Sequence, residues 1–455
     1  MRIDLVVPSF EEEKKRRMKG KAFRVPQLSL GILAALTPPE IEVNYYDENL
    51  ADINFDTGAD LVGITTMTVT APRAYQMAKE YKKRGAKVVL GGIHPSILPH
   101  EALQYADSVV IGEAEYVWPE VIRDFQKKEL KPIYQAKERV KMEDIPFPKR
   151  KIFNNKGYLL TAIFQITRGC PFNCDFCSAH LLFGNFYRKR PIEMVIKEIE
   201  EVDRPLIVFV DDNITGDKRY AKKLFSELIP LKKKWLGEAD LGIADDPELL
   251  KLARRSGCYG LFIGFESVSD AGLKEMNKGF LKVRDMADKI KRIQDAGIMI
   301  EGSFIFGLDT DDKGIFEKTL SFAKNNSLAL ASFGILTPYP GTRLEKRLRE
   351  EGRIITTNWR LYDCGHTVFK PKKMTVEELQ EGLDWTWWNF YSYSSIFKRL
   401  WGVRKSLIVT GIPLLIINFS YRRMLYRTTD IKSWLKEDYQ RLGLEPTPDL
   451  PIEEG

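Results

Sequence analysis

Short apolar runs alternate with helical patterns along the first 140 residues, and this alternation limits the fold more than any other feature. Runs of strand length predict buried strands, and the segments between them have the spacing of amphipathic helices. Strands that alternate with helices favour a parallel, doubly wound α/β sheet. The expected strands are residues 2–8, 41–47, 60–66, 87–91 and 108–112, with helices at 71–84 and 115–127.

The expected strand ends of this first domain are rich in glycines and hydroxyls. Ligands of such sheets bind beyond the carboxyl ends of the strands, so these loops are candidates for holding a close-fitting polar ligand. No G-x-G-x-x-G follows a strand, which disfavours a dinucleotide site. The candidate ligand-binding residues are Thr65, Thr66, Met67, Gly91, Gly92, His94, Gly112 and Glu113.

Three of the five cysteines, Cys170, Cys174 and Cys177, lie within eight residues and are spaced C-x3-C-x2-C. Thiolates this close on one loop can all bind one metal centre. An iron–sulfur cube usually takes four protein thiolates, so three would leave one iron open, as in reactive metal sites.

The same cysteines allow two other uses. A zinc site could take His180 as its fourth ligand, but structural zinc sites usually draw two ligand pairs from separated segments, and no second pair exists. Disulfide bonding fits poorly in a large chain with few cysteines. The stretch 167–180 resembles the signature loop of the radical S-adenosylmethionine (radical SAM) superfamily. The resemblance implies that SAM chelates the open iron and that Phe176 lies near its adenine.

The first domain, residues 1–140, resembles the cobalamin-binding domain that is fused to many radical SAM enzymes. It departs from that domain in one respect, because the D-x-H-x-x-G motif that places a histidine under cobalt is absent. The resemblance therefore implies cobalamin bound without a histidine ligand, or a retained fold without the cofactor. His94 is expected to be a loop histidine satisfied by neighbouring groups rather than a cobalt ligand.

Residues 141–158 contain two prolines and mixed charge, and they read as an extended linker. Six strand–helix units follow in residues 159–355, which fits the partial β/α barrel of the radical SAM family. Active sites of β/α barrels lie at the carboxyl ends of the strands. Residues 356–455 read as a mostly helical extension. The expected barrel strands are residues 160–166, 206–211, 237–243, 260–264, 299–307 and 328–336.

The resemblance places SAM-binding residues at three of these strand ends. Asp211, Asp212 and Asn213 occupy the position that faces the SAM amino group, although such a run also forms strand-to-helix turns. Glu266 could bind a ribose diol, and with Ser267 it could instead cap a helix. Gly302 would let an adenine approach the backbone. Arg343, after the sixth strand, could meet an anionic group.

The rest of the composition bears on compartment and partners. Few cysteines indicate a reducing cytosol, and a formal charge of +7 does not by itself favour nucleic acid. No apolar run is long enough to span a bilayer. Residues 404–423 are apolar with basic ends, which is typical of a segment lying at the inner face of a membrane and equally of a buried helix. The aromatic run 385–391 favours core packing.

The leading hypothesis is a radical SAM enzyme that cleaves SAM to a 5′-deoxyadenosyl radical, with a flavodoxin-type reductase as electron donor. Cobalamin-dependent methylation or carbon–carbon bond formation would follow, at an unactivated carbon of a hydrophobic lipid- or isoprenoid-like substrate. The alternatives are modification of a tetrapyrrole or another soluble metabolite without cobalamin, and a non-enzymatic iron–sulfur or zinc-binding interaction module. RNA methylthiolation would need three more cysteines near the N-terminus, and none precedes Cys170.

Overall fold

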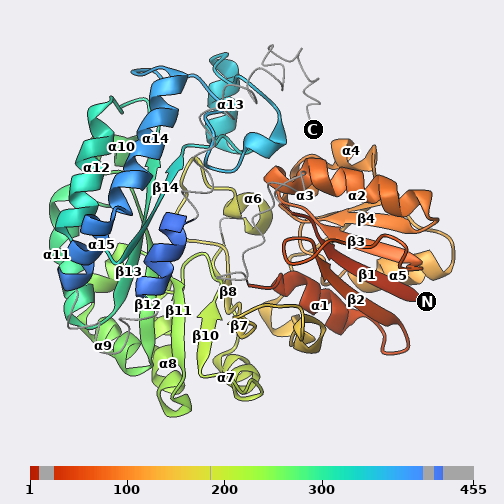
Figure 1. Ribbon diagram of the computed structural model, residues 1–455. Coiled ribbons are helices and arrows are strands. Elements are labelled where there is room, and N and C mark those ends of the chain that lie inside the picture. Colours follow the sequence, from red (N-terminus) through yellow and green to blue (C-terminus); the bar gives the residue numbers. More distant parts are fainter. Residues whose placement is uncertain (10–24, 185, 403–413, 424–455) are drawn as a thin grey trace. The chain divides into compact units, whose positions relative to one another are not determined.

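The computed structural model describes residues 1–9, 25–184, 186–402 and 414–423 of the 455-residue chain (Figure 1). The chain divides into two compact parts. The N-terminal part comprises residues 1–172 and 177–238, and the C-terminal part comprises residues 173–176 and 239–455. The N-terminal part therefore takes in the first expected domain, the linker and the first strands of the expected barrel.

A six-stranded, all-parallel sheet forms the beginning of the N-terminal part, with the strand order β2-β1-β3-β4-β5-β6. All five strands expected from the sequence are present. The sixth, β6, has only three residues, which is too short to stand out as an apolar run. The order reverses between β1 and β3, and ligands of doubly wound sheets bind at such a switch point. The strands are β1 Arg2–Val7, β2 Glu42–Asp47, β3 Leu61–Thr65, β4 Lys87–Gly91, β5 Ser108–Ile111 and β6 Ile133–Gln135.

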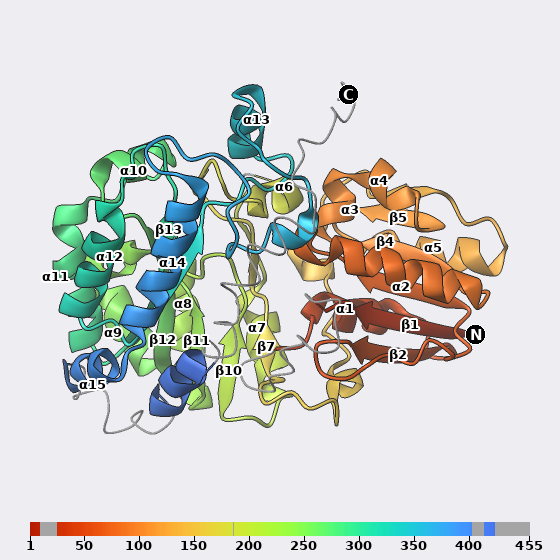
Figure 2. The same cartoon turned by 45° about the horizontal axis from the view of Figure 1, so that its top comes forward.

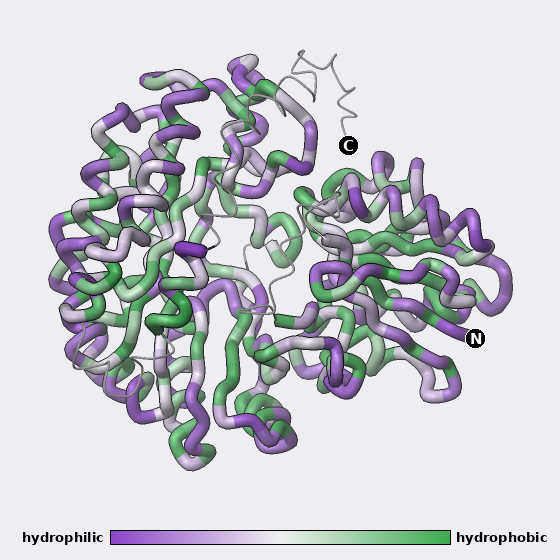
Figure 3. Tube along the Cα trace, in the orientation of Figure 1, coloured by the Kyte–Doolittle hydropathy of each residue, from purple (hydrophilic) through white to green (hydrophobic). Residues whose placement is uncertain are grey.

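Helices cover both faces of this sheet. Successive strand side chains point to opposite faces, and on one face Ile3 and Leu5 pack with Leu30 of α1 and Trp118 of α5. Helix α2 packs on β3 and β4, through Met77 and its neighbours. Figure 3 shows the resulting contrast between apolar strands and helices of mixed polarity. The helices are α1 Leu28–Leu36, α2 Ala71–Lys83, α3 Ile93–Ile97, α4 Pro99–Leu103 and α5 Trp118–Gln126.

The remainder of the N-terminal part begins with the linker, which is not free of the sheet domain. Its Met142 and Ile145, with Val140 just before it, are buried against Ile32 of α1. Three parallel strands then pair in the order β7-β10-β11, and a short antiparallel pair, β8 with β9, flanks the cysteine stretch. The elements are β7 Ile163–Phe164, β8 Thr167–Arg168, α6 Ala179–Phe183, β9 Arg188–Lys189, α7 Ile192–Glu200, β10 Leu206–Phe209, α8 Lys218–Leu228 and β11 Lys234–Glu238.

The third expected barrel strand lies three residues earlier than predicted at its start and five at its end. The sequence pattern suggested residues 237–243, whereas β11 spans Lys234–Glu238 and Leu241–Asp245 form a 3₁₀ turn, η5. Asp240 begins this turn, because its Oδ1 accepts a hydrogen bond from the Gly242 amide at 2.7 Å. A side chain that bonds its own backbone two residues on favours a turn over a strand.

The C-terminal part contains three more parallel strands, β12, β13 and β14, each followed by helix (Figure 2). All three match strands expected from the sequence. Their outward side chains, such as Phe304 and Phe333, stack on one another under α12 and α14. The elements are α9 Pro247–Arg255, β12 Cys258–Glu266, α10 Asp270–Glu275, α11 Val283–Asp295, β13 Met299–Phe306, α12 Gly314–Asn325, β14 Leu330–Ile335, α13 Arg343–Glu350, α14 Val376–Phe390 and α15 Tyr393–Gly402.

Side chains of the C-terminal helices satisfy the outer edge of β14. The Tyr391 hydroxyl donates to the Ala331 carbonyl at 2.8 Å and accepts from its amide at 3.3 Å. Trp387 donates its indole N–H to the Phe333 carbonyl at 2.9 Å. Arg399 donates to the Ala329 carbonyl at 2.9 Å. An exposed strand edge invites unwanted pairing, so these aromatic residues serve as an edge cover, and the predicted core packing of the aromatic run is confirmed for Trp387 and Tyr391.

The described part of the chain contains no helix that is long and apolar enough to cross a membrane. The apolar segment predicted to meet lipid lies only partly within it. Residues 414–423 are helical, and residues 404–413 lie outside the described residues.

Candidate active site

The start of the cysteine stretch is held by two acidic residues that follow β10. Asp211 Oδ1 accepts hydrogen bonds from the Ile166 amide at 2.9 Å, from the Thr167 hydroxyl at 2.7 Å and from the Thr167 amide. Asp212 accepts from the Gly169 amide. Burial raises the pKa of Asp211 to about 7, although these bonds oppose the rise. Both predicted SAM-binding aspartates therefore position the cysteine loop, and direct contact with SAM stays a prediction.

Gly169, just before Cys170, has a φ of +84° and lies with its Cα against the Phe186 carbonyl, so that a Cβ would collide with that oxygen. Only glycine fits there without strain. The side chains of Cys170 and Cys177 are partly exposed, Cys174 is buried, and none of the five cysteines forms a disulfide. Among the described residues, no three histidine, cysteine or acidic side chains are gathered as a ready-made metal site. The donor set still fits an iron–sulfur cluster, because three thiols lie on one short loop.

The middle of the loop, Asn173–Phe176, belongs to the C-terminal part and is anchored there. Arg343 at the start of α13 donates its Nε to Asp175 Oδ1 at 2.9 Å and its Nη1 to Asn173 Oδ1 at 3.0 Å. The Asp175 carbonyl also accepts from the Leu344 amide. Arg343 was expected to meet an anionic group, and in the structure that group is the Asp175 carboxylate.

Glu266 lies where β12 ends, in a left-handed conformation with a φ of +62° and beside a break in the strand register. Such conformations are uncommon for residues other than glycine and cluster at functional sites. Lys278 donates to Glu266 Oε1 at 2.7 Å and to the Gly264 carbonyl at 2.9 Å. This arrangement holds the Glu266 carboxylate beside Gly264 with its side chain 10% exposed, and contact with a ribose hydroxyl stays a prediction. The Ser267 hydroxyl accepts a hydrogen bond from the Ser269 amide. This bond agrees with the alternative that Ser267 helps to cap a helix.

Gly302 and Asn213 take local structural roles. A Cβ on Gly302 would come within 2.8 Å of Leu328 and 3.1 Å of Phe265, so this glycine allows close packing on the core side of β13. Asn213 Oδ1 accepts from the Thr215 amide and hydroxyl, which forms the turn that the sequence allowed as an alternative. Contact of either residue with SAM stays a prediction.

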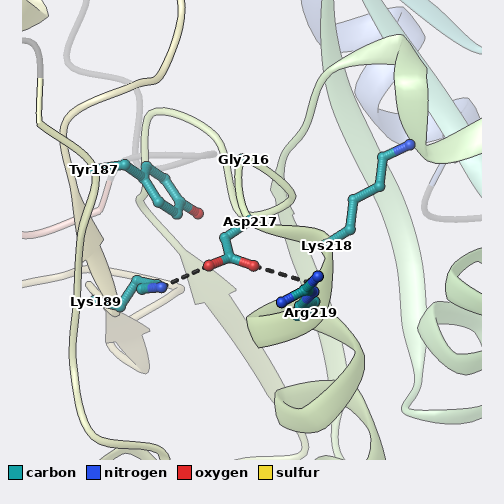
Figure 4. A pocket seen from close by; sticks show the side chains of 6 residues that line it. All are labelled: Tyr187, Lys189, Gly216, Asp217, Lys218 and Arg219. Atoms are coloured by element: carbon teal, nitrogen blue, oxygen red, sulfur yellow. Dashed lines mark hydrogen bonds and ion pairs between the residues drawn. The ribbon is translucent and has the colours of Figure 1, made fainter.

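A basic pocket of about 560 Å³ follows this turn, and its residues are shown in Figure 4. Asp217 accepts from Lys189 at 2.5 Å and from the Arg219 amide at 3.0 Å, so it caps α8 and neutralises one lysine. The pairing with Lys189 lowers the pKa of Asp217. The lining is Tyr187, Lys189, Gly216, Asp217, Lys218 and Arg219. The sequence offered no signal for this pocket, because its cations come from separate segments.

The strand ends of the six-stranded sheet meet at the switch point between β1 and β3. A cavity of about 160 Å³ lies there, lined by Thr65, Met67, Asp47, Asn49 and residues around them. Thr66 is buried, and within the described residues its hydroxyl has no hydrogen-bond partner. Thr66 does not line the cavity, so the fit of a polar ligand there rests on Asp47, Asn49, Thr65 and Thr70, whose polar groups lie at its wall.

Gly92 has a φ of +104°, and its Cα packs on the Thr66 backbone so closely that a Cβ would come within 2.6 Å of the Thr66 carbonyl. The Gly91 carbonyl accepts from the Thr66 amide at 2.8 Å. These glycines let two strand ends lie against each other, which shapes the floor of the predicted site.

His94 is fully buried, and both of its ring nitrogens lie near polar protein groups. Its Nδ1 lies 3.4 Å from the Thr68 hydroxyl and its Nε2 lies 3.2 Å from Glu101 Oε1, which also accepts from Tyr75. The side chain therefore has the satisfied environment expected of it, and it is not presented to a ligand.

Gly112 and Glu113 follow β5. Gly112 has a φ of +75° and donates its amide to the Ser96 hydroxyl at 2.9 Å. Glu113 is buried between Arg168 and Arg188. The sequence reasoning missed both arginines, although one signal was present: Arg168 stands two residues before the first cysteine of the loop.

Three family models match the chain: the Radical SAM superfamily over residues 164–323, the B12 binding domain over residues 28–122, and a Domain of unknown function (DUF4070) over residues 342–411. The first covers the cysteine stretch, and the second covers strands β2 to β5 of the six-stranded sheet. They imply a [4Fe–4S] cluster, SAM and cobalamin as cofactors, as the sequence predicted.

Curated relatives align over most of the chain. Bacteriochlorophyllide d C-12(1)-methyltransferase of Chlorobaculum tepidum is 33% identical, and the match covers 82% of this chain and 84% of that protein. Hopanoid C-2 methylase of Rhodopseudomonas palustris is 28% identical, with 73% of this chain and 66% of that protein covered.

A solved structure shares the fold. The cobalamin-dependent S-adenosylmethionine radical enzyme OxsB, solved with aqua-cobalamin and S-adenosylmethionine bound, superposes with a TM-score of 0.69 at 16% identity, over 98% of this chain and 73% of that one. The predicted α/β fold class is therefore confirmed. Together with the relatives, these matches show that the chain is a radical SAM enzyme and belongs to the family of cobalamin-dependent radical SAM methyltransferases.

Proposed function

We propose that this enzyme transfers a methyl group from SAM to an unactivated carbon of a large, mostly apolar substrate. The observation that carries the proposal is the 33% identity, over most of both chains, with a methyltransferase named for a bacteriochlorophyllide. A more distant relative is named for a hopanoid. The first name denotes a tetrapyrrole and the second a polycyclic lipid, so the chemistry that they share is a large, mostly hydrophobic polycyclic skeleton. Fold alone does not name a substrate.

The bound cofactors supply the radical and methyl-carrier chemistry, and the chain supplies position and exclusion of water. Asp211 and Asp212 fix the entry of the cysteine loop. Arg343 fixes its middle by pairing with Asp175. Glu266, held by Lys278, presents a carboxylate suited to a ribose diol. Within the N-terminal part the two aspartates would hold the entry of the cluster-binding loop, and within the C-terminal part Glu266 would bind SAM.

A test that needs no prior choice of substrate uses SAM with a deuterated methyl group. Purified holoenzyme, reduced anaerobically, would be given hopanoid and chlorin extracts in separate reactions, and products would be searched by mass for a three-deuterium gain. We expect a labelled product in one of the two. A third reaction contains an extract of water-soluble metabolites. Labelled product only in that reaction would overturn the hydrophobic class, and no labelled product in any reaction while SAM is cleaved would contradict methyl transfer itself.

We also propose that the enzyme lies at the inner face of the membrane, where such a substrate is found. Support comes from large apolar side chains on the described C-terminal helices that are exposed to solvent. Tyr393 and Phe397 each lie near Phe419, with ring centroids 6.0 and 6.4 Å apart. Arg422 stacks 4.0 Å over Tyr393. Aromatic residues beside basic ones suit an anionic lipid interface. The exposed set is Tyr393, Phe397, Trp401, Ile416 and Phe419.

Vesicle flotation tests this second proposal. Wild-type protein should float with anionic vesicles at low salt and less so at high salt, because salt screens the attraction. The double variant F397S/W401S should lose flotation while it keeps its cluster and cobalamin. Absence of wild-type binding at low salt would contradict membrane contact without affecting the methyltransferase assignment.

Reduction of the cluster requires an electron donor, for which we propose a flavodoxin-type reductase. The pocket in Figure 4 supports an acidic partner, since Lys189, Lys218 and Arg219 outnumber its one carboxylate, Asp217. Complementary charge mainly accelerates association. Reduction by an acidic flavodoxin should therefore slow as salt rises, and an unchanged rate would argue against this docking.

A further inference from the structure

Four charged side chains from separate segments form a buried cluster in the N-terminal part, which we call the Glu113 cluster. Arg168 donates its Nη1 to Glu113 at 2.6 Å and its Nη2 to Glu115 at 2.5 Å. Arg188 donates to both carboxylate oxygens of Glu113 at 2.9 Å. Arg188 also donates to the Val140 carbonyl, just before the linker, at 2.6 Å.

The cluster is almost closed to water. The exposed fractions of the Arg168, Glu113 and Glu115 side chains are 6, 7 and 8%. Burial alone would raise the pKa of Glu113, but Arg188 and Arg168 outweigh it and lower that pKa. Burial would likewise lower the pKa of Arg168, yet Glu115 and Glu113 raise it above its ordinary value. Two carboxylates face two guanidinium groups, so the buried charges balance.

The segments that this cluster joins are the two cofactor-binding regions of the N-terminal part. Glu113 and Glu115 follow β5, at the carboxyl edge of the sheet that matches the B12 binding domain. Arg168 ends β8, two residues before Cys170, and Arg188 begins β9, its antiparallel partner. Bidentate arginine–carboxylate pairs fix orientation as well as distance.

We propose that the Glu113 cluster sets the distance between the cobalamin-binding edge and the cluster-binding loop, with Arg168 as its central positioning residue. Methyl transfer needs the two cofactors at a defined separation, because small misplacements of reacting groups cost much of the rate. Arg168 contacts neither substrate nor the reacting atoms in this role. It acts through the Glu113 and Glu115 loop on one side and Cys170 on the other. The proposal rests on the cofactor set and not on the proposed substrate.

The chain offers a matched control in the same part. Glu198 of α7 pairs with Arg150 at 2.5 Å and with Arg190, and its side chain is 2% exposed. This second arginine–glutamate–arginine group has the same chemistry and similar burial. It joins the linker to β7 and α7 and contacts no strand end of the six-stranded sheet.

The experiment measures magnetic interaction between the cofactors in the holoenzyme, without substrate. Protein loaded with cobalamin in its cobalt(II) form and with the reduced cluster should show faster spin relaxation of cobalt than protein with the cluster oxidised. R168Q should lose this enhancement while iron content and cobalamin content remain those of wild type. R168K keeps the charge but cannot bond Glu113 and Glu115 in parallel, so it should restore the enhancement only in part.

E198Q serves as the control and E115Q as the milder second variant. E198Q should lower the melting temperature and leave the enhancement as in wild type. E115Q removes one contact of Arg168 and should reduce the enhancement even if R168Q does not fold. Enhancement unchanged in both R168Q and E115Q would overturn the proposal, as would equal loss in E198Q. Absence of the enhancement in wild type that carries both cofactors would overturn it as well.

Discussion

The N-terminal part contains two buried glutamates, each held between two arginines, and they differ in what they join. Glu113 takes Arg168 and Arg188, whereas Glu198 takes Arg150 and Arg190. In both, the carboxylate is almost fully buried and each arginine forms further bonds. Ion-pair chemistry and burial alone therefore do not distinguish the role of one group from that of the other.

Their surroundings separate them. Arg190 also donates to the Ile145 carbonyl at 3.0 Å, and Arg150 donates to the Ile163 carbonyl at 2.7 Å, so the Glu198 group fastens the linker to the first barrel strand. The Glu113 cluster instead joins a sheet edge to the loop of Cys170. The same ion-pair chemistry stabilises the fold at one place and relates two cofactor regions at the other. Location relative to the strand ends distinguishes the two.

The largest expected effect tests whether the cysteine loop that follows Arg168 binds the metal. If it did not, the Glu113 cluster would not join two cofactor regions. Replacement of Cys170, Cys174 and Cys177 together by alanine should reduce bound iron and SAM cleavage to background, because no thiolate would remain on the loop. Iron analysis and quantification of 5′-deoxyadenosine measure both. SAM cleavage that persists in the triple variant would sink the assignment of the loop.

The second-largest expected effect tests whether the Glu198 group stabilises the fold. E198Q removes the charge that compensates two buried arginines, and breaking a buried pair in this way costs about 3–5 kcal/mol. Denaturant unfolding should show that loss. The conservative variant E193Q, on the first turn of the same helix, should unfold like wild type. A stability equal to wild type in E198Q would mean that the Glu198 group does not fasten the linker.

A third, smaller effect concerns pH. The net lowering of the pKa of Glu113 means that its carboxylate stabilises the fold above the ordinary value of 4.5, and that this contribution is lost as pH falls through the lower folded-state value. The difference in unfolding free energy between wild type and E113Q should therefore be constant above about pH 5 and shrink below it. A difference that grows on acidification would contradict the charged pairing.

The smallest expected effect concerns a partly exposed ion pair, whose contribution to stability serves as the reference for both buried groups. Lys189 and Asp217 form an ion pair whose side chains are 38 and 31% exposed. Exposed pairs contribute roughly 0–1 kcal/mol, because water and salt screen them. K189Q should therefore change unfolding free energy by no more than that. A loss in K189Q as large as that in E198Q would show that burial does not separate the groups.

The sequence was sufficient to predict the elements whose signal is local. The five strands of the first sheet are apolar runs bounded by turn residues, and the cysteine spacing is visible in eight letters. β6 was not predicted, because its three residues are too few to show a periodic pattern. The third barrel strand was placed late, because Leu241 and Ile243 look like strand residues and are buried in a turn capped by Asp240.

What could not be predicted depends on contacts between distant segments. Glu113 was a candidate ligand on the strength of its strand end, yet Arg168 and Arg188, 55 and 75 residues away, occupy its carboxylate. Asp211 is predicted to face SAM, and no local pattern indicated that its Oδ1 accepts from Thr167, 44 residues away. The cover of β14 by Tyr391 spans 60 residues. A pattern within one segment carries no information about partners that are distant in the sequence.

The most direct test of the central claim counts both cofactors on one protein. Anaerobically reconstituted wild-type chain should bind about four irons and about one cobalamin, since the cysteine loop and the strand ends form separate sites. The absorption spectrum should indicate cobalt without a histidine base. H94A should give the same cobalt spectrum, because His94 is occupied by Thr68 and Glu101. An intact cluster with no cobalamin uptake would contradict the account.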